Sequence, residues 1–218
     1  MTKLQVALDF FSLEDAVKIA KMVAEAGADI LEIGTPLIHM EGLKKSIREI
    51  KKIASDFGQE VLVDLKLADV GYETAKKAFS LGADAITVLA AVNDNTILGT
   101  LKAKEEFGGK VMADLILSKD LKNDADRVIN LGVDYVLIHL GIDVQRRIDI
   151  ISYINSLRVN IPSEKLVVAG GITLDKLDKF AELKPAIIIV GRAITRSENP
   201  YLTTKKFLQR LDLLKLRP

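Results

Sequence analysis

The sequence predicts a compact (β/α)8 TIM barrel, with residues 1–218 forming a single α/β domain. Short apolar runs rich in Val, Ile and Leu alternate eight times with longer amphipathic segments, and no Pro-, Gly- or Ser-rich linker separates them. Strict alternation of this kind is typical of parallel strands joined by helical crossovers. A Gly-Ala/Val-Asp turn precedes the second, fourth and sixth runs, which indicates that one type of helix-to-strand connection recurs along the chain.

The apolar runs predict eight strands, in chain order 4–9, 28–34, 60–66, 83–90, 110–117, 133–140, 165–172 and 185–191. Each is followed by a segment with helical spacing of apolar residues. These predict eight helices, at 12–27, 41–58, 74–82, 95–108, 122–132, 143–157, 174–183 and 201–214. In the first helix, Ser12 and Asp15 form a capping-box pattern and Gly27 follows the last turn.

The structural alternative is a doubly wound open sheet, which would carry a Gly-rich turn after its first strand. Residues 8–15, LDFFSLED, contain no glycine. A chain of 218 residues also suffices for a small barrel, so the barrel is the preferred interpretation.

Composition excludes several classes of function. The chain is 49% hydrophobic and 28% charged with a net charge of +1, so no strong field favours nucleic acid or an acidic membrane surface. It contains no cysteine, which excludes disulfides, thiolate metal sites and a cysteine nucleophile. The first residues lack a signal-peptide pattern, and the longest apolar runs are too short to span a bilayer. We therefore expect a cytoplasmic protein with no nucleic-acid or membrane partner.

Polar residues gather at the carboxyl ends of the expected strands, where barrel enzymes build their active sites. These residues are Asp9, Glu32, Asp64, Lys66, Asp114, His139, the Gly170-Gly171 pair and the Gly191-Arg192 pair. Because the strands are parallel, their carboxyl ends meet at one rim. The pattern therefore predicts one site that draws on most of the barrel.

The third strand carries the motif D-x-K-x-x-D at residues 64–69. Side chains alternate along a strand, so Asp64 and Lys66 should share the inner face, and Asp69 should lie beyond the strand in a loop. The structural alternative is a buried Asp–Lys ion pair with Asp69 as a helix cap. Glu32 on the neighbouring strand makes this alternative less favourable, because the Glu32 and Asp64 carboxylates repel each other unless a cation or proton lies between them. Two carboxylates with substrate oxygens and waters make a Mg²⁺ site.

Three further side chains at the rim are open to more than one interpretation. Asp9 and Asp114 could each contact substrate, anchor a loop or form a hydrogen bond with Lys66. His139 is one of two histidines, and histidine is the residue type best suited to proton transfer near neutral pH. The other, His39, is expected to be a solvated loop residue before the second helix.

Glycines at the ends of the last two strands indicate a phosphate site. Gly170, Gly171 and Gly191 allow backbone N–H groups to approach phosphate oxygens, and Arg192 can add charge-assisted hydrogen bonds. The loops after strands seven and eight form the phosphate site of many barrels.

The motifs ALD (7–9), EIGTPL (32–37), DLKLAD (64–69), AGGI (169–172) and VGRAIT (190–195) resemble the orotidine 5′-monophosphate decarboxylase suprafamily over essentially the whole chain. The suprafamily contains a metal-independent decarboxylase, which carries a lysine on strand two, and two Mg²⁺-dependent enzymes. This chain has Glu32 in place of that lysine. The resemblance therefore implies a Mg²⁺ enzyme with Glu32 and Asp64 as metal ligands.

Strand six favours one metal-dependent branch. Residues 139–145, HLGIDVQ, resemble the H-T-G-x-D-x-Q of the hexulose phosphate synthases, although Leu140 replaces the threonine. The 3-keto-L-gulonate 6-phosphate decarboxylases carry an arginine where this chain has Ile142. The resemblance implies an aldolase that condenses formaldehyde with ribulose 5-phosphate through an enediolate. The alternatives are a decarboxylase of 3-keto-L-gulonate 6-phosphate or of orotidylate, and a non-catalytic phosphate-binding protein.

The resemblance also implies roles for the rim residues. Lys66, Asp64 and His139 would act on the sugar phosphate, and Asp9, Asp114, Gly170, Gly171, Gly191 and Arg192 would bind it. Asp69 would reach the active site of a partner subunit, which implies a homodimer with active sites at the subunit interface.

Overall fold

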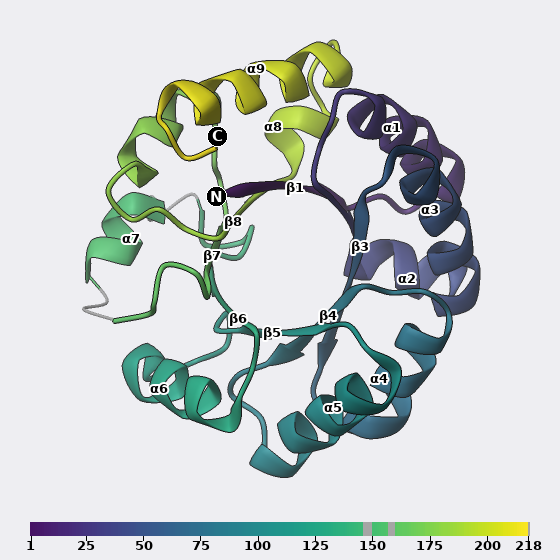
Figure 1. The fold of residues 1–218 in the computed structure, drawn as a ribbon, viewed down its shortest axis with the longest axis vertical. Helices are drawn as coiled ribbons and strands as arrows, with labels where there is room; N and C mark the ends of the chain where they lie inside the picture. The colour runs from purple at the N-terminus through teal and green to yellow at the C-terminus, as the bar shows by residue number, and fades with distance from the viewer. Residues whose placement is uncertain (146–149, 157–159, 218) are drawn as a thin grey trace.

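The computed structural model describes residues 1–145, 150–156 and 160–217. Eight parallel strands close into a barrel in the order β1-β2-β3-β4-β5-β6-β7-β8, with helices around it (Figure 1). This confirms the predicted single-domain (β/α)8 barrel. The strands are β1 (Lys3–Leu8), β2 (Ile30–Ile33), β3 (Glu60–Leu67), β4 (Ala85–Leu89), β5 (Lys110–Asp114), β6 (Tyr135–His139), β7 (Leu166–Ala169) and β8 (Ile187–Val190).

The helices follow the strands in turn. They are α1 (Leu13–Glu25), α2 (Thr35–Glu41), α3 (Leu43–Phe57), α4 (Gly71–Ser80), α5 (Asp94–Phe107), α6 (Leu121–Leu131), α7 (Ile150–Ser156), α8 (Arg192–Thr195) and α9 (Pro200–Leu213), with the 3₁₀ helix η1 at Leu174–Phe180. The Ser12 hydroxyl caps α1 by accepting from the Asp15 N–H at 3.4 Å, as the sequence pattern predicts. None of the helices in the described ranges is long and apolar enough to cross a membrane.

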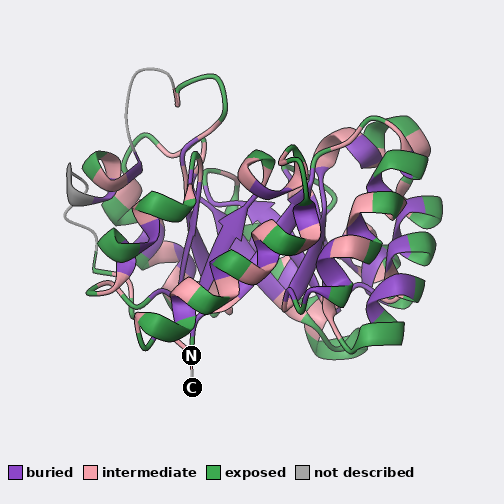
Figure 2. Ribbon diagram, turned by 90° about the horizontal axis from the view of Figure 1, so that it is seen from above, coloured by how far each residue is buried: buried purple, intermediate pink, exposed green. Residues whose placement is uncertain are grey.

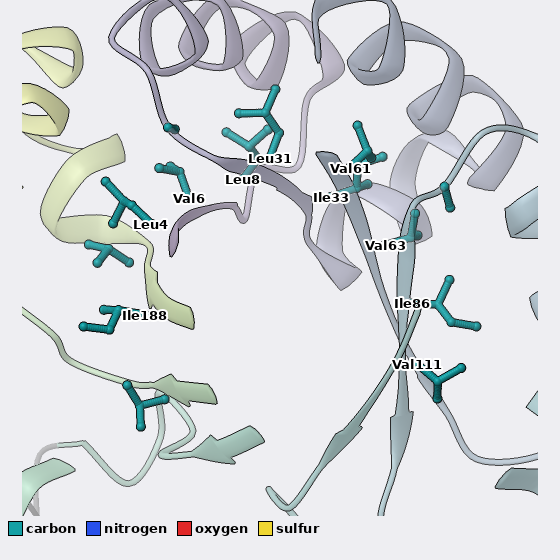
Figure 3. Packing of buried hydrophobic residues seen from close by; sticks show 14 of the residues in the cluster. Leu4, Val6, Leu8, Leu31, Ile33, Val61, Val63, Ile86, Val111 and Ile188 are labelled. Carbon is teal, nitrogen blue, oxygen red and sulfur yellow. The ribbon is translucent and has the colours of Figure 1, made fainter. Parts of the chain in front are cut away.

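The strands bury both of their faces, as Figure 2 shows for the purple centre of the molecule. Outward side chains such as Leu8, Leu31 and Val61 fill the layer between strands and helices (Figure 3). Inward side chains such as Leu62 and Met112 form a smaller cluster inside the barrel. Each fully buried Leu, Ile or Val contributes about 1.5–3 kcal/mol by removal from water. This packing holds the carboxyl ends of the strands at a fixed rim.

The three Gly-Ala/Val-Asp turns make the same two types of contact. In each, the aspartate carboxylate accepts a backbone N–H from the preceding strand: Asp29 from Leu4 at 2.8 Å, Asp84 from Val61 at 2.7 Å and Asp134 from Val111 at 2.8 Å. Each carboxylate also pairs with a cation, namely Arg217, Lys51 and Lys104 in that order. The repeated motif thus ties neighbouring strands together at the amino end of the barrel.

Three local expectations need correction or fall partly outside the described residues, and one short helix is additional. Residues 174–183 do not form the expected α-helix. The 3₁₀ helix η1 takes the place of its first part, and its three residues per turn put Leu174, Leu177 and Phe180 on one side. His39 is exposed as expected but lies in α2, which begins after Gly34 with Pro36 in its first turn. The short helix α8 was not expected. Within the predicted helix 143–157, α7 covers Ile150–Ser156, whereas 146–149 and 157 lie outside the described residues.

Candidate active site

A cavity of about 480 Å³ opens at the carboxyl ends of the strands. A volume of this size suits a small phosphorylated substrate. Most of the predicted rim residues line it, namely Asp9, Glu32, Asp64, Lys66, His139, Gly170, Gly171, Gly191 and Arg192. The structure therefore brings together residues from the ends of six strands, as the sequence predicts. Asp114 and Asp69 are not among the lining residues.

Glu32 is a buried carboxylate in a crowded acidic setting. It pairs in register with Ala7 and Leu62, which places it one inward position below Asp64. Burial, together with the nearby Asp64 and Asp9 carboxylates, raises the pKa of Glu32 to about 8. Its Oε2 accepts a 2.6 Å hydrogen bond from the amide of Gln5, a buried residue of β1. The metal-free site therefore holds Glu32 protonated through most of the neutral range.

Asp64 is bound on both of its oxygens. Its Oδ1 accepts from the Thr87 hydroxyl at 2.8 Å, and its Oδ2 pairs with the Lys66 ammonium. The Thr35 hydroxyl, at the start of α2, lies 3.0 Å from the same Oδ2. These contacts hold the carboxylate in a fixed orientation at the floor of the cavity.

Lys66 sits where β3 departs from regular pairing. The register with β4 shifts between Val63 and Leu67, and Lys66 has a φ of 43°, a region that costs a non-glycine residue about 1 kcal/mol or more. Its N–H donates to the Thr87 hydroxyl oxygen at 2.9 Å, which supports this conformation. Burial alone would lower the pKa of Lys66, but the attraction of Asp64 and Asp114 raises it. The ammonium therefore stays charged in the cavity.

Asp114 lies behind the cavity and contacts His139. Its side chain has no solvent exposure, and its Oδ2 lies 2.9 Å from Nδ1 of His139 and 4.0 Å from the Lys66 ammonium. Its Oδ1 accepts the Ile116 N–H at 2.9 Å. Asp114 is thus a partner of both His139 and Lys66, one of the roles that its sequence position left open.

The opposite end of the cavity is cationic and rich in glycine. Gly170 and Gly171 follow β7, and Gly191 separates β8 from α8, which begins with Arg192. Gly170 has a φ of 117°, and a side chain there would collide with the Leu140 carbonyl. Glycine at this position therefore allows the segments that follow β6 and β7 to lie close together. Arg192 and Arg196 both line this end of the cavity.

Asp9 follows β1 and is exposed toward the cavity. Its carboxylate lies against Gly34, where any side chain would collide with it. The enclosing cavity walls and the nearby Asp64 carboxylate raise the pKa of Asp9. The glycine of the EIGTPL motif thus makes room for the aspartate of the ALD motif.

Asp69 behaves differently from the other predicted residues. It lies in the loop between β3 and α4, is exposed, and accepts the Val70 N–H at 2.8 Å. It does not line the cavity described above. The next residue, Val70, has a φ of 54°, which is rare for a β-branched side chain.

The residues present fit a divalent cation in part. Within the described residues, no three acidic, histidine or cysteine side chains are arranged to hold a metal ion. Glu32 and Asp64 nevertheless place two carboxylates in one cavity, where burial and then their mutual repulsion raise the pKa of Glu32. Mg²⁺ is commonly bound by one or two carboxylates, with the other positions filled by substrate oxygens and waters. A pair of carboxylates, one of them protonated without metal, matches that donor set.

Sequence reasoning assigned no site role to several polar residues of the cavity. Gln5, Thr87 and Gln145 line it, together with Arg196. Gln5 could have been found from strand alternation, since it lies two residues before Ala7 and four before Asp9 on the inward side of β1. Thr87 carries no comparable signal, because threonine is common in strands.

Comparisons with known proteins agree with this geometry. A family model described as the orotidine 5′-phosphate decarboxylase/HUMPS family matches residues 2–207. The chain belongs to this family.

Within the family, the chain is 37% identical over 209 residues to a 3-hexulose-6-phosphate synthase from Bacillus subtilis, covering 95% of this chain and 97% of that one. A solved 3-hexulose-6-phosphate synthase from Salmonella typhimurium superposes with a TM-score of 0.87 at 34% identity, covering 98% and 100% of the two chains. A 3-keto-L-gulonate-6-phosphate decarboxylase from Vibrio cholerae gives a TM-score of 0.80 at 26% identity, covering 100% and 99%. Family members with different reactions thus share the barrel.

Proposed function

We propose that this chain is a Mg²⁺-dependent aldolase that condenses formaldehyde with ribulose 5-phosphate to give 3-hexulose 6-phosphate, and catalyses the reverse cleavage. The observation that carries the proposal is Glu32, a buried glutamate beside Asp64 at the position where the orotidylate decarboxylases have a lysine. The similarity to 3-hexulose-6-phosphate synthases over 95% of the chain supports the same assignment.

The reaction begins with loss of a proton from C1 of the ketose. Asp114 accepts a hydrogen bond from Nδ1–H of His139, so Nε2 is left to take the C1 proton. The electron pair of the broken C–H bond moves into the enediolate, which Lys66 stabilises with its charge and a hydrogen bond. C1 then attacks formaldehyde as the C2 carbonyl re-forms, so that a C–C bond replaces the C–O π bond of formaldehyde. The resulting alkoxide oxygen takes the proton that His139 Nε2 carried, which returns the imidazole to its starting form.

Glu32 and Asp64 would hold the Mg²⁺ ion. When bound, the ion would act as a Lewis acid that offsets the negative charge developing on the substrate oxygens. The chain itself orients these two ligands, through Gln5 on Glu32 and through Thr87 and Thr35 on Asp64. Gly170, Gly171, Gly191 and Arg192 would hold the phosphate, so that binding energy at the remote end aligns C1.

The proposal includes a homodimer in which Asp69 completes the active site of the partner subunit, in the cytoplasm and without a nucleic-acid partner. Apolar exposure near Asp69 supports an interface there. Val70 exposes 57% of its surface, and Leu98 on α5, which packs against α4, exposes 45%. Mixing Asp69→Ala with Lys66→Ala subunits should restore activity, because half of the sites in a heterodimer would be intact. A mixture that exchanges subunits and stays inactive would argue against shared sites.

The test of the proposal is consumption of formaldehyde in the presence of ribulose 5-phosphate, with Mg²⁺ and then with EDTA. We expect consumption that needs the metal and is lost in Glu32→Gln. The same preparation should release no CO₂ from 3-keto-L-gulonate 6-phosphate or orotidylate. CO₂ release without formaldehyde consumption would instead establish a decarboxylase. Ile142, which lines the cavity where the gulonate decarboxylases carry an arginine, speaks against that result.

A further inference from the structure

Gln145 connects three loops at the cationic end of the cavity. Its amide nitrogen donates a 2.8 Å hydrogen bond to the carbonyl of Leu140, the residue that follows β6. Its amide oxygen accepts a 3.0 Å hydrogen bond from the Arg192 guanidinium, beyond β8. The same oxygen would lie 3.5 Å from a Cβ on Gly171, beyond β7, so the side chain passes over that glycine. One amide thus spans the ends of β6, β7 and β8.

The two contacts fix which way the amide faces. The Leu140 carbonyl can only accept a hydrogen bond, and the guanidinium can only donate. The NH₂ group must therefore face Leu140 and the oxygen must face Arg192. Neither leucine, which has no polar atoms, nor glutamate, which cannot donate, would satisfy both neighbours.

The neutrality of this partner matters for anion binding. Among the described residues, the Gln145 oxygen is the acceptor that the Arg192 guanidinium contacts. The Asp9 carboxylate interacts with Arg192 through its charge but forms no ion pair with it in the part of the chain that the structure describes. An exposed arginine loses rotamer entropy when it binds a ligand. A neutral acceptor restricts those rotamers without neutralising the charge. The remaining N–H groups stay available for phosphate oxygens.

We propose that Gln145 is a positioning residue that holds the Arg192 guanidinium toward the phosphate end of the cavity without offsetting its charge. This inference rests on the proposed phosphorylated substrate, but it concerns the anion site alone and not the carbon chemistry. Gln145, the glutamine of the HLGIDVQ stretch, would thereby help the site to select phosphorylated over unphosphorylated sugars.

The primary test is a double-mutant cycle measured by binding of inorganic phosphate in calorimetry, which needs no turnover. The variants are Gln145→Met, Arg192→Met and the double variant, with Gln209→Met on the exposed face of α9 as a control for the substitution itself. We expect Gln145→Met to weaken phosphate binding about tenfold, the effect of one lost hydrogen bond to a charged group. In the Arg192→Met background the same change should have no further effect, because Gln145 acts through Arg192. The control should bind as the unmodified chain does.

A second variant separates orientation from charge. Gln145→Glu can still contact Arg192 but would neutralise it, so phosphate binding should fall further than in Gln145→Met. In turnover, kcat/KM of Gln145→Met should fall by a larger factor for ribulose 5-phosphate than for ribulose. Equal losses from Gln145→Met with and without Arg192, or no loss at all, would overturn the inference, as would absence of phosphate binding by the unmodified chain. Phosphate results as expected without aldol activity would instead refute the proposed reaction alone.

Discussion

Nδ1 of His139 lies 2.9 Å from Oδ2 of Asp114, a carboxylate with no solvent exposure. The ionised carboxylate accepts, so it selects the tautomer with the proton on Nδ1 and leaves Nε2 as the base in the cavity. The catalytic histidine of the proposed mechanism is therefore prepared by a residue that does not itself line the site.

Asp114→Asn should lower kcat by about two to four orders of magnitude, because an amide can donate to Nδ1 and so favour the wrong tautomer. Steady-state kinetics would measure the loss, and ¹⁵N NMR would report the tautomer directly. The chain has only one other histidine, His39, so the His139 signals can be assigned with a His39→Gln variant. The exposed Asp126→Asn on α6 serves as the control. Unchanged kcat with an unchanged tautomer would contradict the assigned role.

Glu32 should make the metal-free protein less stable as the pH rises. Its pKa is about 8 in the folded chain, against an ordinary value of 4.5. Between these values the folded state binds more protons than the unfolded state, so stability present at low pH is lost toward pH 8. The loss should approach about 1.4 kcal/mol per pH unit within this window. Urea unfolding in EDTA at several pH values would measure it.

Glu32→Gln is the matched variant for that prediction, because it keeps the side-chain size and removes the titration. The difference in unfolding free energy between the two proteins should change with pH in EDTA. Adding Mg²⁺ at pH 7.5 should stabilise the unmodified chain and leave Glu32→Gln unaffected. Parallel pH profiles of the unfolding free energy for the two proteins would show that Glu32 does not titrate between pH 4.5 and about 8.

Thr87→Val should destabilise the protein and impair the site. The hydroxyl of this buried residue accepts the Lys66 N–H at 2.9 Å and donates to Asp64 at 2.8 Å. Valine has the same shape but leaves the N–H unpaired, at a cost of about 1–3 kcal/mol. Thr204→Val is the control, because that buried hydroxyl bonds only the Pro200 carbonyl one helical turn earlier. If chemical denaturation gave equal losses of unfolding free energy for the two variants, the hydrogen bond between the Lys66 N–H and Thr87 would contribute nothing specific to stability.

Asp134→Asn should destabilise the barrel without changing the active site. Asp134 accepts the Val111 N–H and pairs with Lys104, both at 2.8 Å, at the amino end of the strands. Loss of the charge should cost about 1–3 kcal/mol of unfolding free energy. Because the turn lies at the opposite end from the cavity, phosphate affinity should remain the same. A drop in affinity would mean that the two ends of the barrel are coupled.

The barrel and the rim could be predicted because their signals are local. Alternating apolar runs define parallel strands, and ionisable residues such as Glu32 and Lys66 stand out at strand ends where burial of charge is costly. Gln5 and Thr87 were missed because uncharged polar residues inside strands are common and gain significance only from their partners. The 3₁₀ helix η1 was mistaken for an α-helix because Leu174, Leu177 and Phe180 fit either spacing over so short a segment.

Exchange of the C1 protons of ribulose 5-phosphate with D₂O, followed by NMR without formaldehyde, tests the central claim most directly. The unmodified chain with Mg²⁺ should exchange one C1 proton stereospecifically, because the enediolate forms before the aldehyde is needed. His139→Gln and Glu32→Gln should each abolish the exchange. Absence of exchange by the unmodified chain, or undiminished exchange by His139→Gln, would contradict the proposed chemistry of this site.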